Sequence, residues 1–263
     1  MTAATGAGWI EQDFHDTLQK ISDGLEKIQQ KSHEMEQKLN RVLRFILVPG
    51  IADAIIAGFQ KFIELRDKFI DEAQEFLTQP GWPFSLFRIG DMWENKVGTP
   101  LSVQAAIMGA GRREADNSWT GSAARAYHDA ADEQSAAAQS FKPLAEKVQD
   151  LLNDLGYGLI GLAVAIAFAV TTFILEMAAA IIAAASVVGA PASPEIAIGA
   201  AISGIGLLGA AVAAYLEFLE RINSSERAIK QNLDDSSGIP DGHWPDINKR
   251  ITGGGSTWKV ATD

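Results

Sequence analysis

The chain has 263 residues, 47% of them hydrophobic, which is enough to bury a sizeable core in one elongated domain or two small ones. Its 22 basic and 33 acidic side chains give a formal net charge of −11, which repels phosphate backbones and argues against nucleic acid as a partner. The sequence contains no cysteine, which excludes disulfide bonds and thiol chemistry. The N-terminal residues lack a basic cluster followed by an apolar run, so we expect any export to proceed without a cleaved secretory signal peptide.

The first predicted element is a long helix with a heptad seam. Apolar residues recur at alternating steps of three and four from Phe14 to Ile46, with Ser32 as the polar interruption. We expect Ser32 to help fix the register and Gly24 to weaken the helix slightly. We expect the seam to bind a helical partner or another copy of the chain. The partner-helix seam includes Leu18, Ile21, Leu25, Ile28 and Leu39.

A second amphipathic run follows a proline–glycine pair and passes through Ile55, Phe62 and Phe76 before the sequence TQPGWPF. Residues 1–86 are therefore predicted to form an N-terminal long helical hairpin. The segment after it is less regular. The pair Thr99–Pro100 predicts the start of a short helix, because threonine caps helices well and proline is tolerated in the first turn.

A second heptad helix is predicted after Gly121. Its main row has residues seven apart, and Pro143 within it should bend or divide the helix. We expect Phe141 and Val148 in this row to contact a partner helix. The row consists of Tyr127, Gln134, Phe141, Val148 and Leu155.

The composition then becomes almost purely apolar, and residues 156–220 are predicted to form a hydrophobic helical hairpin. Between Tyr157 and Leu216 the only charged residues are Glu176 and Glu195. Each half is about 20 residues long, which is enough to cross a bilayer core of about 30 Å. Small residues such as Gly199 and Gly206 suit close helix packing. A carboxylate at Glu176 should face protein or water.

Three interpretations of this hairpin remain open. It could be buried in a soluble core, it could span a membrane, or it could be exposed by assembly or insertion after secretion in a soluble form. Tyr157, Glu176, Gly199, Gly206 and Leu216 mark the segment that would mediate membrane contact or assembly. Residues 221–263 are predicted to be a polar irregular tail.

The turn before the second heptad helix carries a recognisable motif. In WTGSAARAY, residues 119–127, Trp119 is two residues before Gly121 and Tyr127 follows six residues later. We expect Gly121 to adopt an unusual backbone angle and Trp119 to close the end of the bundle, burying on the order of 200 Å² against the facing helix.

This array resembles the Trp-x-Gly superfamily of type VII secretion substrates. With the apolar region that follows, the chain is most similar to the ESX-secretion-associated, Esp-like proteins of mycobacteria and other actinobacteria. The resemblance implies an all-α fold, export to the cell surface or beyond, virulence association, and contact with the type VII secretion machinery and a helical partner. It identifies residues 87–155 as a Trp-x-Gly helical hairpin module. The family's Tyr-x-x-x-Asp/Glu export signal is absent, since Tyr127 is followed by Ala131 and Tyr215 by Leu219.

The residues do not indicate an enzyme. The four histidines share no spacing, and His128 with Asp129 and Asp132 is typical of a solvated helical face rather than a metal site. A phosphate-binding glycine loop and a Gly-x-Ser-x-Gly turn are both absent from the sequence. We therefore expect no catalytic residue, cofactor or metal.

The sequence as a whole predicts an all-α, elongated helical bundle with coiled-coil seams. The function implied is that of a non-enzymatic type VII secretion-associated substrate, acting through partner binding, self-assembly or contact with membrane lipid. One alternative is a pore-forming protein that inserts residues 157–218. Another is a soluble helical scaffold with no export role.

Overall fold

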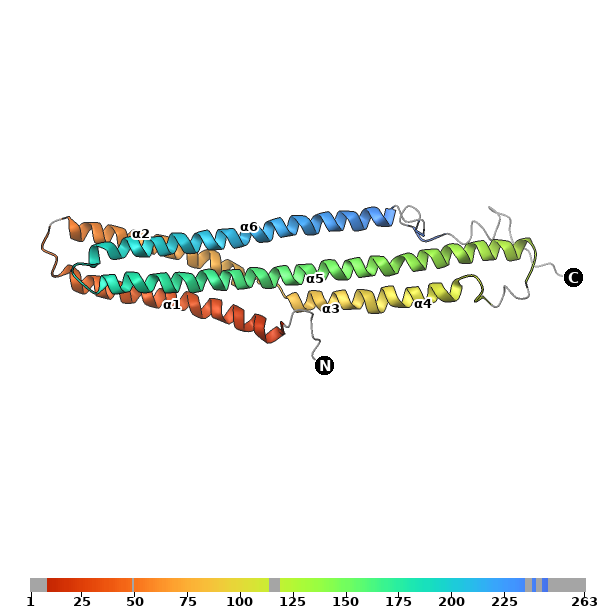
Figure 1. Cartoon of the computed structure of the whole chain (residues 1–263), viewed down its shortest axis with the longest axis horizontal. Helices are drawn as coiled ribbons and strands as arrows, with labels where there is room; N and C mark the ends of the chain where they lie inside the picture. The colour runs from red at the N-terminus through yellow and green to blue at the C-terminus, as the bar shows by residue number, and fades with distance from the viewer. Residues whose placement is uncertain (1–8, 49, 114–118, 235–237, 240–242, 246–263) are drawn as a thin grey trace. The chain divides into compact units, whose positions relative to one another are not determined.

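The all-α prediction is confirmed. The structure, a computed structural model, describes residues 9–48, 50–113, 119–234, 238–239 and 243–245, and no strand occurs among them. The elements in chain order (Figure 1) are α1 (Glu11–Leu43), α2 (Ile51–Thr78), α3 (Pro83–Trp93), the π-helical turn η1 (Glu94–Gly98), α4 (Thr99–Met108), α5 (Ser122–Ala184), the 3-10 turn η3 (Ala190–Ala192) and α6 (Ser193–Asp234).

The chain divides into two compact units that are discontinuous in sequence. The first unit is built from Met1–Pro83 and Tyr157–Phe218, and the second from Phe84–Gly156 and Leu219–Asp263. The expected N-terminal hairpin and the hydrophobic hairpin therefore share one unit. The Trp-x-Gly module and the C-terminal segment share the other. Sequence order suggested four successive segments, whereas packing joins them in two pairs.

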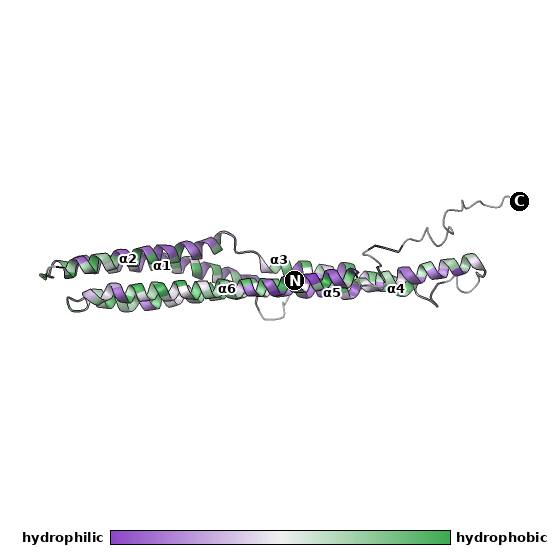
Figure 2. Cartoon of the chain, turned by 90° about the horizontal axis from the view of Figure 1, so that it is seen from above, coloured by the Kyte–Doolittle hydropathy of each residue, from purple (hydrophilic) through white to green (hydrophobic). Residues whose placement is uncertain are grey.

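In the first unit, α1 and α2 cover one side of the apolar hairpin formed by α5 and α6. Phe173 of α5 lies at the centre, with its ring 6.5 Å from that of Phe62 and 4.7 Å from that of Phe69, both on α2 and both nearly perpendicular to it. Such edge-to-face contacts between buried rings add to the hydrophobic stabilisation. In Figure 2, α1 and α2 lie on one side of α6, whose ribbon within this unit is largely in the hydrophobic colour.

Gly24 has a packing role that its low helix propensity does not suggest. A Cβ atom at this position would lie 2.3 Å from Cγ1 of Val170 on α5, far inside van der Waals contact. The missing side chain therefore allows α1 and α5 to approach closely. The small cost in helix propensity expected from the sequence is offset by this packing.

In the second unit, the helical segment before Trp119 runs antiparallel to the first part of α5. Ser135 donates a hydrogen bond from its hydroxyl to the carbonyl oxygen of Ala105 at 2.8 Å. Further toward the N-terminus, Gly90 of α3 lies against Gln149. The pairing therefore runs in opposite chain directions, as in a helical hairpin.

Three boundary predictions need correction. The predicted helix from Thr99 to about Met108 is present as α4, but the less regular segment expected before it is helical too, since helical backbone is continuous from Pro83 to Met108. The π-helical turn η1 precedes Pro100, whose missing N–H and bulky ring would disturb a regular α-helix, and the N–H of Thr99 bonds to the carbonyl of Glu94. Pro143 does not divide α5, and it lies on the exposed side of that helix, where its ring disturbs no helix contact.

The third correction concerns the C-terminal segment. The irregular tail was expected from residue 221, but α6 continues to Asp234. Ile222 is buried and Ile229 is half-buried, seven residues apart on one face of the helix. This short heptad row is the signal for the extra turns of helix.

Candidate functional site

The Trp-x-Gly motif forms the entrance to α5. Gly121 has φ +108°, a backbone conformation that favours glycine, and its carbonyl accepts the N–H of Arg125 at 3.1 Å to open the helix. The ring of Trp119, which precedes α5, lies 5.5 Å from that of Tyr127 in the second turn of α5. Residues 114–118, which precede the motif, lie outside the described residues.

The expectation that Trp119 is buried against a facing helix is wrong. It remains 42% exposed, and its ring packs on Tyr127 of α5, the helix that follows it in the chain. An indole that covers a neighbouring tyrosine and also faces solvent stabilises the turn modestly and remains available for contact with another molecule.

Arg113 fixes the chain beside this motif, and sequence reasoning missed it. Its buried guanidinium donates to the backbone carbonyl of His128 at 3.0 Å and forms an ion pair with Asp132 at 3.0 Å. Asp132 is thereby held in a structural contact. Among the described residues, no group of three or more histidine or acidic side chains could hold a metal ion.

The predicted seam of α1 is covered by the chain itself. Ile21, Leu25, Ile28 and Leu39 are buried in the first unit, and Leu18 is half-buried against the same core. Their helical partners are therefore intramolecular. In the second unit Phe141 and Val148 are half-buried, and the ring of Phe141 lies 6.1 Å from that of Trp244.

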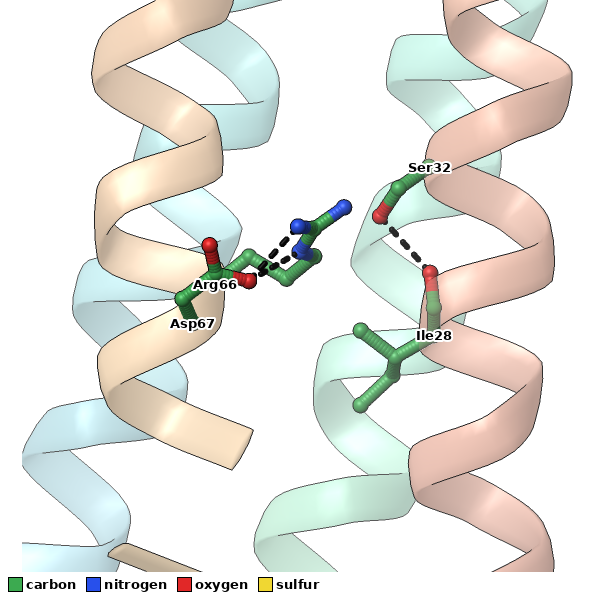
Figure 3. A network of polar contacts seen from close by, with 4 residues as sticks. All are labelled: Ile28, Ser32, Arg66 and Asp67. Atoms are coloured by element: carbon green, nitrogen blue, oxygen red, sulfur yellow. Dashed lines mark hydrogen bonds and ion pairs between the residues drawn. The ribbon is translucent and has the colours of Figure 1, made fainter. Parts of the chain in front are cut away.

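Ser32 satisfies its hydroxyl within its own helix. The side chain is buried and donates to the carbonyl oxygen of Ile28 at 2.7 Å (Figure 3). Across from it on α2, the guanidinium of Arg66 extends toward α1 and is held by Asp67 at 2.6 Å. Local bonding explains how a polar group is tolerated in the seam.

The apolar hairpin has an inner side and an outer side. On α5 the buried residues Ile166, Val170 and Phe173 alternate with exposed residues two positions away. Two positions correspond to about 200° around a helix, so the exposed row points away from the core. The row on α5 consists of Tyr157, Gly161, Val164, Phe168, Leu175 and Ile182.

An equivalent row runs along α6, offset by two positions from buried Ala197, Ala200 and Gly204. It consists of Ile196, Gly199, Ile202, Gly206, Gly209, Val212 and Leu216. We call the two rows together the outer face. Within this face Phe168, Leu175 and Ile182 are 61%, 68% and 74% exposed.

Glu176 links the two helices of the hairpin. It is half-buried, and one carboxylate oxygen accepts a hydrogen bond from Ser203 of α6 at 3.3 Å. The carboxylate thus faces protein, as expected for a charge in an apolar segment. Near the other end of the pair, Gly158 lies under the ring of Phe218. These contacts make α5 and α6 antiparallel neighbours, so their exposed rows form one surface.

Glycines of the first unit differ in their surroundings. A Cβ on Gly24, Gly58 or Gly158 would collide with a neighbouring element, whereas Gly161, Gly199, Gly206 and Gly209 meet nothing within 4 Å. Each glycine inside a helix costs about 1 kcal/mol relative to alanine. On the inner side, close packing against a neighbouring element offsets this cost. On the outer face, no group of the described chain packs against the glycines, so the cost is not offset there.

By length and composition, two helices could cross a membrane. Their most apolar windows, in α5 and in the segment from η3 into α6, are 33% and 28% buried, although core helices of soluble proteins meet the same criterion. Comparison with family models, with curated proteins and with solved structures gives no match for this chain. The two features of the structure that bear on function are therefore the outer face and the turn at Trp119.

Proposed function

We propose that this chain is a non-enzymatic, type VII secretion-associated substrate that acts outside the producing cell by self-assembly through its outer face. The observation that carries the proposal is the apolar, nearly uncharged outer face of α5 and α6. A second copy of the chain is the occupant that fits this surface best.

The size of the outer face supports self-assembly. From the exposed fractions of its side chains, the face leaves on the order of 800 Å² of apolar surface open, which is about the area that one partner buries in a standard protein interface. The largest apolar patch on a typical monomer is roughly 300–600 Å². An unpaired face of this size favours association in water.

The chemistry of the outer face also suits a second copy. The same surface can pair with itself about a two-fold axis, since it has no charge along its centre that would face a like charge. Gly199 and Gly206 would let a partner helix approach as closely as α1 approaches α5 at Gly24.

The assignment to type VII secretion is supported by the Trp119 turn. Gly121 has the left-handed backbone, Trp119 contacts Tyr127, and the motif stands immediately before the second helix of an antiparallel pair. The resemblance implies this arrangement. It also implies recognition by the secretion machinery and release without a cleaved signal.

Sedimentation velocity of the full chain in detergent-free buffer tests self-assembly. We expect dimers or larger species at micromolar concentration, and at least a tenfold weaker association for Gly206→Leu, because the added side chain occupies the space that a partner would fill. Ala106→Leu, at an exposed position of α4, is the matched control and should associate like the wild type. A wild-type chain that remains monomeric throughout this range would overturn the proposal.

Export is tested separately with Trp119→Ala in a type VII-competent host. The half-exposed ring should contribute little to folding, so circular dichroism should show unchanged helicity while the secreted fraction falls strongly. Undiminished export of a folded variant would remove the main support for the secretion assignment.

Insertion of residues 157–218 into a bilayer is a second candidate, favoured by the two helices that are long and apolar enough to cross a membrane. Insertion would require α1 and α2 to leave the inner side, where the buried core now lies. Dye leakage from vesicles at a rate that rises with protein concentration would favour this candidate. Tight assembly without leakage would favour self-association.

A further inference from the structure

Two loops of the first unit expose large apolar side chains to solvent. Residues 44–48 follow α1 in its connection to α2, and residues 185–189 join α5 to η3; we call these two segments the tip loops. Leu47 is 90% exposed and Val188 is 93% exposed. Phe45, Val48 and Val187 are also at least half exposed. Full exposure of aliphatic side chains is costly in water, so these residues suit an apolar environment.

The tip loops lie at the same end of the first unit. Pro194, just after η3, packs against Gly58 of α2, and α2 contacts η3 directly. Figures 1 and 2 both place the two loops together at one end of this bundle. The exposed side chains of the two loops therefore form a common apolar end.

The rest of each loop is anchored, which separates the exposed residues from a merely loose segment. Ile46 and Ile51 pack against the core on either side of Leu47. The N–H of Phe45 bonds to the carbonyl of Val42 at 2.9 Å. In the other loop, the N–H of Ala190 bonds to the carbonyl of Ser186 at 2.9 Å. Backbone groups that are already paired lower the cost of placing a loop at an apolar boundary.

The charge around the tip loops is less acidic than that of the whole chain, with Asp53 and Glu195 as the acidic residues that follow the two loops. Between Glu36 and Asp53 every charged residue is basic, namely Lys38, Arg41 and Arg44. Arg41 and Arg44 are exposed and make no ion pair within the part of the chain that the structure describes. The second tip loop has no charge at all from residue 177 to residue 194. A chain with net charge −11 thus presents an apolar end with two exposed arginines, Arg41 and Arg44, on its α1 side.

We propose that the tip loops dock this protein end-on to an anionic lipid bilayer. Leu47 and Val188, with their exposed neighbours, enter the headgroup region, while Arg41 and Arg44 contact lipid phosphates. The acidic residues along the rest of α1 and α2 are repelled by the same surface, which orients the tip of the first unit toward the membrane. The outer face takes no part in this contact, so the inference stands independently of self-assembly.

The cysteine-free sequence permits a direct test with single labels. Val188→Cys and Leu47→Cys carry an environment-sensitive fluorophore, and Ile107→Cys on α4, itself half exposed, is the matched control. The probes are vesicles of phosphatidylcholine with or without phosphatidylglycerol. We expect blue-shifted, stronger emission at positions 188 and 47 on anionic vesicles and no change at position 107. Unchanged emission at both tip positions would overturn the proposal.

Unlabelled variants give the size of the effect by vesicle co-sedimentation. Leu47→Ser with Val188→Ser should weaken binding at least tenfold, because two exposed apolar side chains are lost without disturbing the core. Arg41→Gln with Arg44→Gln should weaken binding to anionic vesicles about 30-fold, since each basic residue near such a surface contributes about fivefold. Wild-type binding in either pair of variants would contradict the docking mode.

The Gly206→Leu variant separates this proposal from self-assembly. If the tip contacts lipid, the label at position 188 should respond to vesicles in Gly206→Leu as it does in the wild-type sequence. If the label instead responds to protein concentration without vesicles, the tip is a contact between copies and the lipid proposal is wrong.

Discussion

The two sides of the α5–α6 hairpin share one composition and differ in what covers them. Phe173 is fully buried between rings of α2, whereas Phe168, little more than a turn earlier, is 61% exposed. Gly24 on α1 meets the inner side at close range, whereas Gly206 on the outer face meets nothing. A hydrophobic helix is thus covered only where the chain supplies amphipathic partners. Here α1 and α2 cover one side.

The largest expected effect tests this comparison with two phenylalanines of one helix. Phe173→Ala should lower the free energy of unfolding by about 3–5 kcal/mol, because it opens a cavity in the core. Phe168→Ala should change it by less than about 0.5 kcal/mol at concentrations where the chain is monomeric. Urea unfolding followed by circular dichroism measures both. Equal losses would mean that the outer face is covered within one chain.

The second comparison uses two glycines whose replacement by alanine should change the free energy of unfolding in opposite directions. Gly24→Ala should destabilise the fold by about 1–3 kcal/mol, since the new methyl group would overlap the buried side chain of Val170. Gly206→Ala should stabilise it by up to about 1 kcal/mol, because alanine favours the helix and the space is open. Thermal unfolding of dilute protein measures the difference, and the same sign for both variants would argue against the glycine roles described above.

The Ser203→Ala variant tests a hydrogen bond at the border between the inner side and the outer face of the α5–α6 hairpin. Loss of its hydrogen bond to Glu176 should cost about 0.5–1.5 kcal/mol, because a half-buried carboxylate loses a donor. Glu176→Gln keeps an acceptor at this position and should retain part of the stability. If Ser203→Ala is neutral in urea unfolding while Glu176→Gln is not, the hydrogen bond is not what holds the carboxylate in place.

The smallest expected effect on stability comes from an ion pair on the solvent-exposed side of α1, which is polar where the outer face is apolar. The hydrogen bond from Lys38 lowers the pKa of Glu34 below its usual value of 4.5. A lowered pKa contributes stability above the unfolded-state pKa, and this contribution is lost as the pH falls through the folded-state value. Lys38→Met should therefore cost a few tenths of a kcal/mol at neutral pH and nothing in strong acid. A larger loss in acid than at neutral pH would contradict this assignment.

Much of the core of the first unit could be predicted from the sequence. The heptad rule selects Ile21, Leu25, Ile28 and Leu39, all of which are buried, because a long helix can hide only one continuous stripe. The nearly uncharged apolar composition predicted the helical hairpin of residues 156–220, and the sequence GAPASPE predicted its break, where η3 now stands. Helix continuity was harder to predict. Proline lowers local helix stability, but a π-helical turn precedes Pro100, and Pro143 lies on the exposed side of α5, where water can reach the carbonyl that loses its donor.

The candidate site could be predicted from the sequence only in part. Gly121 could be predicted to adopt an unusual backbone angle, since a turn stands before a helix there, and its φ is +108°. The partial exposure of Trp119 and the ion pair of Arg113 could not be predicted from the sequence, because both depend on where α5 lies relative to the loop before it. Leu47 and Val188 are ordinary loop residues in sequence. Their exposure depends on which neighbours anchor the loop and which are left out.

By itself, the sequence determined that the chain is all-helical, that α1 and α2 are amphipathic, and that the hairpin after Tyr157 is apolar on every side. Those properties follow from local propensity and from the period of the hydrophobic pattern. Tertiary structure alone decided that α1 and α2 pack on the same side of the hairpin, leaving the outer face and the tip loops uncovered. A helix that is apolar all round carries no periodic signal for which of its faces is filled, so that choice is made by packing between segments distant in the chain.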